Sequence, residues 1–132
     1  MSGVLVDSDV IIEVLRQQNR EILQSWIELA DSPEAVICSP ISVAEVFHGM
    51  RDREKNIIER LFSGMLCFPI DQQIGRRAGD YLRLFHKSHS LALGDALIAA
   101  TASTFDLVLW TRNRRRFPMK DLHFFASKNR AH

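Results

Sequence analysis

Short apolar runs alternate along this chain with longer stretches of mixed polarity. The apolar runs are rich in Val, Ile and Leu, which is typical of strands buried on both faces of a parallel sheet. We place these strands at 4–6, 35–38, 66–70 and 107–110, with a fifth short one near 123–126. In the stretches between them, apolar residues recur every three or four positions, which predicts helices over 9–16, 21–30, 40–48, 52–62, 72–86 and 92–103.

Local signals mark several of the expected helix ends. Ser39 followed by Pro40 predicts a helix start, because serine caps the first turn and proline fits the first helical position. Gly49 is placed to end that helix, and Asp71 to cap the long helix that begins after it.

The alternation of strands and helices continues throughout the chain. It predicts an α/β fold, a three-layer α/β/α sandwich around a mainly parallel sheet of four or five strands. We see no internal repeat and no linker, so we expect one domain over residues 1–132.

Composition restricts the class of protein. Apolar residues make up 46% of the chain, which is enough for a packed core. The apolar runs are far shorter than the ~20 residues of a membrane span, and Asp7 and Asp9 interrupt the N-terminal run where a signal peptide would need one. We therefore expect a soluble, cytoplasmic protein without a membrane role. Cys38 and Cys67 lie in apolar runs without zinc-site spacing, which predicts buried free thiols.

Charge is distributed unevenly. The net charge is +1, but residues 1–110 are acidic on balance, and the charged residues of 111–132 are all basic except Asp121. A basic end on an acidic domain indicates a polyanion or an acidic peptide as partner, although it could equally be a solvated tail. The basic residues of this end are Arg112, Arg114, Arg115, Arg116, Lys120, Lys128 and Arg130.

The first candidate for chemistry is Asp7, which directly follows the first strand. Ligands of open parallel sheets bind beyond the carboxyl ends of the strands. Asp7 could instead cap the next helix, but Ser8 or Asp9 could fill that role equally well. This surplus of capping residues leaves Asp7 free for another task.

Two further carboxylates occupy similar positions. Ser42 and Glu45 match a capping box, but the helix start at Ser39 places Glu45 in the second turn, within a very apolar stretch. A carboxylate there needs a partner such as a cation. Asp95 opens an apolar, Ala-rich helix, where the helix dipole alone could explain an acid. Carboxylates from three separate elements would together supply the oxygen ligands that a hard cation such as Mg²⁺ prefers.

Four segments follow one another along the chain: LVDSDVII at 5–12, ISVAE at 41–45, GDALIAATA at 94–102 and LWTRN at 109–113. In this order they resemble a PIN-domain ribonuclease of the VapC toxin type, from a toxin–antitoxin pair. The resemblance spans nearly the whole chain, and the third segment is its most specific part.

The resemblance implies a Mg²⁺- or Mn²⁺-dependent endoribonuclease that cleaves RNA with a metal-activated water. Asp7, Glu45 and Asp95 fall on the family's acidic metal-site positions, and Thr111 and Asn113 on its strand-end Thr-x-Asn motif, which supports the catalytic site. The resemblance also implies an RNA substrate, a small VapB-like antitoxin that wraps over the active site, and a homodimer.

One position departs from the family pattern. A fourth acid often stands three residues after the motif's Asn, but this chain has Arg116 there, followed by Phe117. We expect Arg116 at the rim of the carboxylates, where its charge disfavours a second metal ion. With Arg112, Arg114 and Arg115 it is predicted to bind RNA phosphates.

Two other function classes stay open. A catalytically degenerate PIN-fold module would bind RNA or protein without cutting, and Arg116 motivates this alternative. A phosphoacceptor signalling domain is also a small α/β sandwich, and Asp71 follows the third strand, but no lysine lies at a suitable strand end. No GxSxG, Walker, GxGxxG or HExxH pattern points to another enzyme class.

Overall fold

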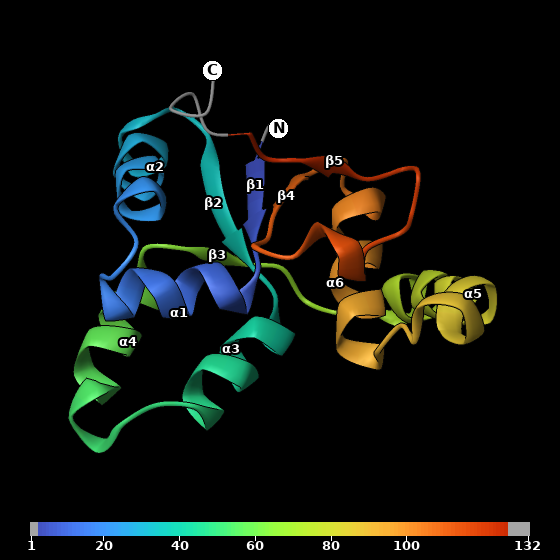
Figure 1. Ribbon diagram of the computed structural model, residues 1–132, viewed down its shortest axis with the longest axis horizontal. Helices are drawn as coiled ribbons and strands as arrows, with labels where there is room; N and C mark the ends of the chain where they lie inside the picture. The colour runs from blue at the N-terminus through green and yellow to red at the C-terminus, as the bar shows by residue number, and fades with distance from the viewer. Residues whose placement is uncertain (1–2, 127–132) are drawn as a thin grey trace.

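The computed structural model describes residues 3–126 (Figure 1). Residues 1–2 and 127–132 lie outside the described part, and with them Lys128 and Arg130 of the basic end. The strands are β1 (Gly3–Val6), β2 (Ala35–Cys38), β3 (Leu66–Cys67), β4 (Val108–Trp110) and β5 (His123–Phe124). The helices are α1 (Ser8–Arg16), α2 (Arg20–Asp31), α3 (Pro40–His48), α4 (Lys55–Ser63), α5 (Gln72–His89) and α6 (Leu93–Thr104), with short 3-10 helices η1 (Asp52–Glu54) and η2 (Arg114–Arg116).

The strands form one sheet in the order β3-β2-β1-β4-β5, and every neighbouring pair is parallel. The expected parallel α/β sheet is therefore confirmed. The chain builds β1, β2 and β3 outward in one direction and then returns to place β4 on the other side of β1. This reversal makes the carboxyl ends of β1 and β4 the topological switch point, where ligands of open α/β sheets bind.

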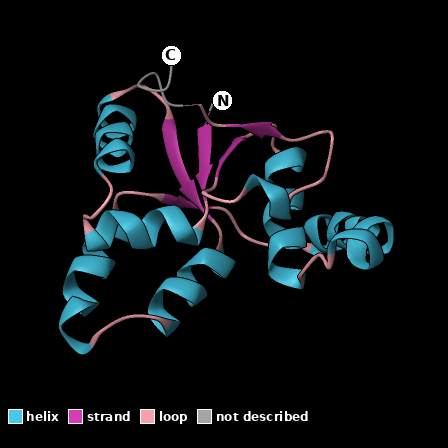
Figure 2. Ribbon diagram, viewed as in Figure 1, coloured by secondary structure: helices cyan, strands magenta, loops and turns pink. Residues whose placement is uncertain are grey.

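Helices cover both faces of the sheet (Figure 2). Successive side chains of a strand point to opposite faces, so Leu5 packs in one core cluster while Val4 and Val6 pack in the other. The cluster around Val4 and Val6 contains buried residues of α1 to α4, and the cluster around Leu5 contains residues of α5 and α6. No helix within residues 3–126 is both long and apolar enough to cross a membrane.

The predicted helix signals act as expected at three positions. Ser39 caps α3 with Pro40 in its first turn, Gly49 ends that helix, and the Asp71 side chain accepts a hydrogen bond from the backbone N–H of Ile74. The strand predicted over 66–70 is shorter than expected. The N–H of Phe68 still donates to Cys38, but Pro69 has no N–H with which to extend the ladder.

The two cysteines are register partners on neighbouring strands, β2 and β3. Both thiols are free, and Cys38 is buried as predicted. The prediction is wrong for Cys67, which is exposed because β3 is the edge strand of the sheet. Burial, and then the neighbouring Cys67, raise the pKa of Cys38 to about 12, so its thiol stays protonated.

Candidate active site

Asp7 lies at the switch point between β1 and β4. Its backbone N–H donates to the carbonyl of Trp110 at 2.9 Å, and the Thr111 hydroxyl donates to its Oδ2 at 2.9 Å. Its side chain is 1% exposed, so these contacts hold a charge in the interior of the protein. Its other oxygen, Oδ1, accepts the N–H of Ser8 at 2.8 Å and thereby caps α1. Asp7 itself is the cap, although Ser8 and Asp9 were equally able to fill that role, so the surplus of capping residues does not leave Asp7 free of it. One Asp7 oxygen caps the helix, and the other faces the site.

Glu45 approaches Asp7 from α3. Its Oε1 accepts the hydroxyl of Ser8 at 2.9 Å, and Ser8 is the residue whose N–H Asp7 binds. The prediction that Glu45 lies in an apolar environment is wrong. Glu45 is exposed on α3, while the buried face of that helix carries Ser42 and Val46.

Asp95 enters the site from the first turn of α6, with a side chain that is 14% exposed. A Cβ atom at Gly94 would lie 3.3 Å from Ile41 Cγ2, so a glycine here permits α6 to approach α3 closely. Burial raises the pKa of Asp95, Arg116 opposes this effect, and the charges of Asp7 and Glu45 raise that pKa further. The three carboxylates expected from the sequence are therefore close enough to influence one another.

Asp9 is a fourth carboxylate of this cluster, which sequence reasoning considered only as a helix cap. It accepts the backbone N–H of Arg112 at 3.1 Å and the hydroxyl of Thr111 at 3.4 Å. Burial, followed by the charge of Asp7, raises its pKa. The sequence signal for Asp9 is the same surplus of capping residues at the start of α1, which leaves Asp9 available for the cluster once Asp7 caps the helix.

The Thr-x-Asn motif contributes one side chain to the cluster. Thr111 is buried and bonds Asp7, as described. The Asn113 side chain is exposed and forms no hydrogen bond within residues 3–126. Instead, the backbone N–H of Asn113 donates to Thr111 Oγ1 at 3.2 Å, which fixes the turn after β4.

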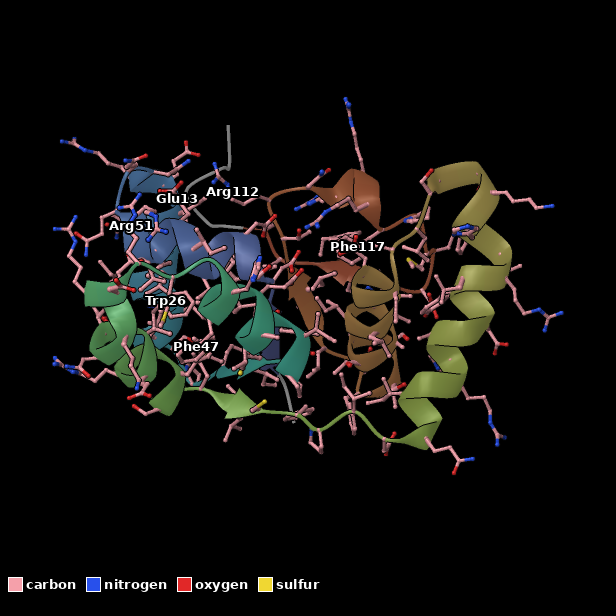
Figure 3. The ribbon with its side chains drawn as sticks, turned by 90° about the horizontal axis from the view of Figure 1, so that it is seen from below. Glu13, Trp26, Phe47, Arg51, Arg112 and Phe117 are labelled. Carbon is pink, nitrogen blue, oxygen red and sulfur yellow. The ribbon has the colours of Figure 1, made fainter. Side chains whose placement is uncertain are left out.

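Three of the four predicted RNA-binding arginines lie outside the cluster. Arg112 forms an ion pair with Glu13 of α1 at 3.0 Å, and Figure 3 shows the two residues near each other. Arg114 donates to the carbonyl of Phe125 at 3.0 Å. Arg115 is exposed and forms no ion pair with the described residues, so its charge faces solvent.

Arg116 lies within the cluster and not at its rim, which corrects the expectation. Its Nη2 is 2.8 Å from Asp7 Oδ2 and 3.4 Å from Asp9 Oδ2, and its Nη1 is 3.3 Å from Asp95 Oδ1. The next residue, Phe117, is 3% exposed and anchors the end of η2 in the core (Figure 3). Arg116 is therefore held at the position from which its guanidinium reaches three carboxylates.

The cluster has the chemistry of a divalent-cation site, with carboxylate oxygens as its potential ligands. As arranged here, no group of three or more carboxylate, histidine or cysteine side chains among residues 3–126 is suited to hold a metal ion. The Arg116 guanidinium bridges Asp7 and Asp95. The residue types thus fit a metal ion, while Arg116 takes the oxygens that the ion would need.

A groove of about 470 Å³ opens beside the cluster, between α2 and the turn after β4. Thr111 belongs both to its wall and to the carboxylate cluster. The groove is lined by Asn19, Trp110, Thr111, Arg112, Asn113 and Arg115, among others.

Comparison with known proteins identifies relatives over most of the chain. The PIN domain family matches residues 4–121. Ribonuclease VapC10 of Mycobacterium tuberculosis is 41% identical over 117 residues, which cover 88% of this chain and 86% of the relative. Toxin FitB of Neisseria gonorrhoeae is 30% identical, with coverage of 92% and 96%. The crystal structure of FitAcB from Neisseria gonorrhoeae matches with a TM-score of 0.71 at 30% identity, covering 93% of this chain and 96% of that one.

Proposed function

Because this chain belongs to the PIN-domain family, we propose that it is the endoribonuclease toxin of a toxin–antitoxin pair, and that it cleaves RNA at the carboxylate cluster. The observation that carries this proposal is the convergence of Asp7, Glu45 and Asp95 from three separate elements. They meet at the switch point of a parallel sheet, close to a groove that could take an RNA strand.

Asp7, Glu45 and Asp95 would hold a Mg²⁺ or Mn²⁺ ion, with Asp9 beside them. When bound, such an ion lowers the pKa of a water molecule and offsets charge that develops on phosphate oxygens. The remaining roles belong to neighbouring side chains. The Thr111 hydroxyl orients Asp7, and the Ser8 hydroxyl orients Glu45.

The groove wall supplies contacts for the RNA backbone. Arg115 is the arginine there whose charge faces solvent, so we assign it to phosphate binding. Arg112 and Arg114 already have protein partners, and they contribute to RNA binding to the extent that they keep a donor free. The exposed amide of Asn113 can donate to a phosphate or a base.

A cleavage assay tests the proposal. The purified protein should degrade RNA in the presence of Mg²⁺ or Mn²⁺ and stop when EDTA is added. Asp95→Asn should abolish cleavage, while Asp106→Asn should retain it, because the Asp106 side chain is 91% exposed and lies outside the cluster. Undiminished cleavage in excess EDTA would overturn the metal-dependent mechanism.

The position of Arg116 favours a second candidate function. A guanidinium inside the cluster is what a catalytically degenerate module would contain, one that binds RNA or protein without cutting. The same assay separates the two functions. RNA retention without cleavage under either ion, by a protein free of nuclease contamination, would support the degenerate module.

The protein partner is an antitoxin, since a similar chain, 28% identical, was solved in the toxin–antitoxin complex from Klebsiella pneumoniae. We further propose that residues 1–132 form a single PIN-like domain, that the toxin is a homodimer, and that it acts in the cytoplasm. Sedimentation of the purified toxin, alone and with its antitoxin, would measure both assembly states.

A further inference from the structure

Arg116 contacts three carboxylates of the cluster at unequal distances. The contact of its Nη2 with Asp7 is short at 2.8 Å, but the contacts with Asp9 and Asp95 are 3.4 and 3.3 Å. Its Nε is buried and has no hydrogen-bond partner among residues 3–126. A buried donor without a partner lowers the stability of the folded state. The carboxylates therefore attract the guanidinium by charge, but they leave one of its donors unbonded.

The side chain can leave without any change in the fold. The backbone of η2 is fixed on one side by the N–H of Arg116, which donates to Asn113, and on the other by the buried Phe117. The Arg116 side chain itself is 37% exposed, so rotation about its own bonds would bring the guanidinium into solvent. Departure would also restore hydration to the unpaired Nε.

Arg116 and a divalent ion need the same oxygen atoms. An ion held by Asp7 and Asp95 would need direct contact with their oxygens, and the guanidinium already contacts Asp7 Oδ2 and Asp95 Oδ1. If both were present, two positive groups would be in direct contact in a largely buried cluster. Four ionised carboxylates, by contrast, repel one another, so without a cation some of them would have to take up a proton or move apart.

We propose that Arg116 is a positioning residue that acts as an exchangeable counter-cation: it holds the carboxylates together in the metal-free protein and leaves them when a divalent ion binds. This inference rests on the proposed metal-dependent function. It follows that the affinity of the site for metal is set by exchange with Arg116 and is weaker than four carboxylates alone would give. Once released, the guanidinium is available to a substrate phosphate, which arginine binds in a bidentate manner.

Mn²⁺ titration, followed by the electron paramagnetic resonance signal of the free ion, tests this exchange without any cleavage measurement. The variant Arg116→Gln should bind Mn²⁺ about tenfold more tightly than the parent, or tighter still. Arg116→Lys should fall between them, because an ammonium keeps the charge but cannot bridge the carboxylates as a planar fork does. The matched control is Arg115→Gln, which removes a neighbouring charge outside the cluster and should leave the affinity within about twofold of the parent.

Thermal unfolding tests whether Arg116 stabilises the carboxylate cluster in the metal-free protein. Arg116→Gln should lower the melting temperature, and saturating Mn²⁺ should raise it by more in this variant than in the parent. Equal or weaker Mn²⁺ binding by Arg116→Gln would overturn the exchange while leaving the proposed function intact. Absence of Mn²⁺ binding in the parent and all variants would overturn the metal-dependent function itself.

Discussion

The hydroxyl of Thr111 donates to Oδ2 of Asp7 at 2.9 Å, although the two residues are 104 positions apart in the sequence. This bond joins the ends of β1 and β4 at the switch point of the sheet. The Asp7 oxygen that receives it is also the one that Arg116 contacts. Thr111 therefore restricts the orientation of the Asp7 carboxylate.

Replacing Thr111 with valine should weaken this arrangement. Valine has nearly the same shape but cannot donate to Asp7 or accept the N–H of Asn113. We expect a loss of about 1–2 kcal/mol in the free energy of unfolding, measured by urea denaturation, together with reduced cleavage. Thr111→Ser keeps the hydroxyl and should retain most of the activity. Full activity in Thr111→Val would show that Asp7 needs no such orientation.

Two substitutions at Asp7 should separate its two roles. Asp7→Asn keeps an oxygen that can cap α1 but removes the charge of the site, so cleavage should cease. Asp7→Ala removes both, and the lost cap should cost about 1 kcal/mol more in unfolding free energy than in the Asn variant. Chemical denaturation of both variants, beside a cleavage assay, gives the comparison. Equal stabilities would mean that Ser8 or Asp9 takes over the cap.

Asp95→Asn should make the metal-free protein slightly more stable at pH 7. Burial raises the pKa of Asp95 in the folded state, so the folded protein binds this proton more tightly than the unfolded chain does. Stability from this group is therefore lost as pH rises through the window between the ordinary carboxyl pKa and the raised one. Melting curves from pH 4 to pH 7 should show the advantage of the variant growing with pH. A variant that melts far below the parent at pH 7 would assign Asp95 a structural role in α6.

Arg115→Ala should flatten the salt dependence of RNA binding. Each phosphate contact contributes about −0.7 to the slope of log affinity against log salt for a single strand. The control is Arg83→Ala, an exposed residue on α5, remote from the groove. Binding isotherms at several salt concentrations measure both slopes. An unchanged slope in Arg115→Ala would show that Arg115 makes no phosphate contact and is available to bind the antitoxin.

Tyr81 should limit stability at alkaline pH. Burial raises the pKa of its hydroxyl, which lies 2.8 Å from both Ser103 and Asp121. Above about pH 10 the unfolded chain loses this proton before the folded protein does, so stability falls as pH rises. Tyr81→Phe should be less stable at neutral pH by about 1 kcal/mol, yet lose less stability between pH 9 and pH 11. Parallel pH profiles for the two proteins would contradict this role.

The arrangement of strands and helices could be predicted from the sequence because its signals are local. Apolar runs, the Ser39-Pro40 start and the Asp71 cap each act within one turn or one strand. The shortened β3 was missed because an apolar run alone does not reveal that Pro69 ends the pairing. The exposure of Cys67 was missed for a related reason, since the run does not show which strand lies at the edge.

The site was only partly predictable because its decisive contacts are distant in sequence. Asp7, Glu45 and Asp95 stood out by position, each at a strand end or near a helix start. The contact of Arg116 with Asp7 spans 109 positions. The family pattern singles out Arg116 by its position, but nothing in the run of three arginines shows that its guanidinium enters the cluster. The burial of Phe117, which anchors the end of η2 beside Arg116, depends on the tertiary fold.

The central place of β1 has a consequence for motion in this protein. β1 is bonded on both sides, so its amides should exchange with solvent only when the whole domain unfolds. η2 is a three-residue helix outside the sheet, held by short-range backbone bonds and the buried Phe117, so its amides should exchange sooner than those of β1. Asp7 therefore adjoins the slowest-exchanging strand of the sheet, whereas Arg116, which neutralises it, lies on a segment that should open more readily.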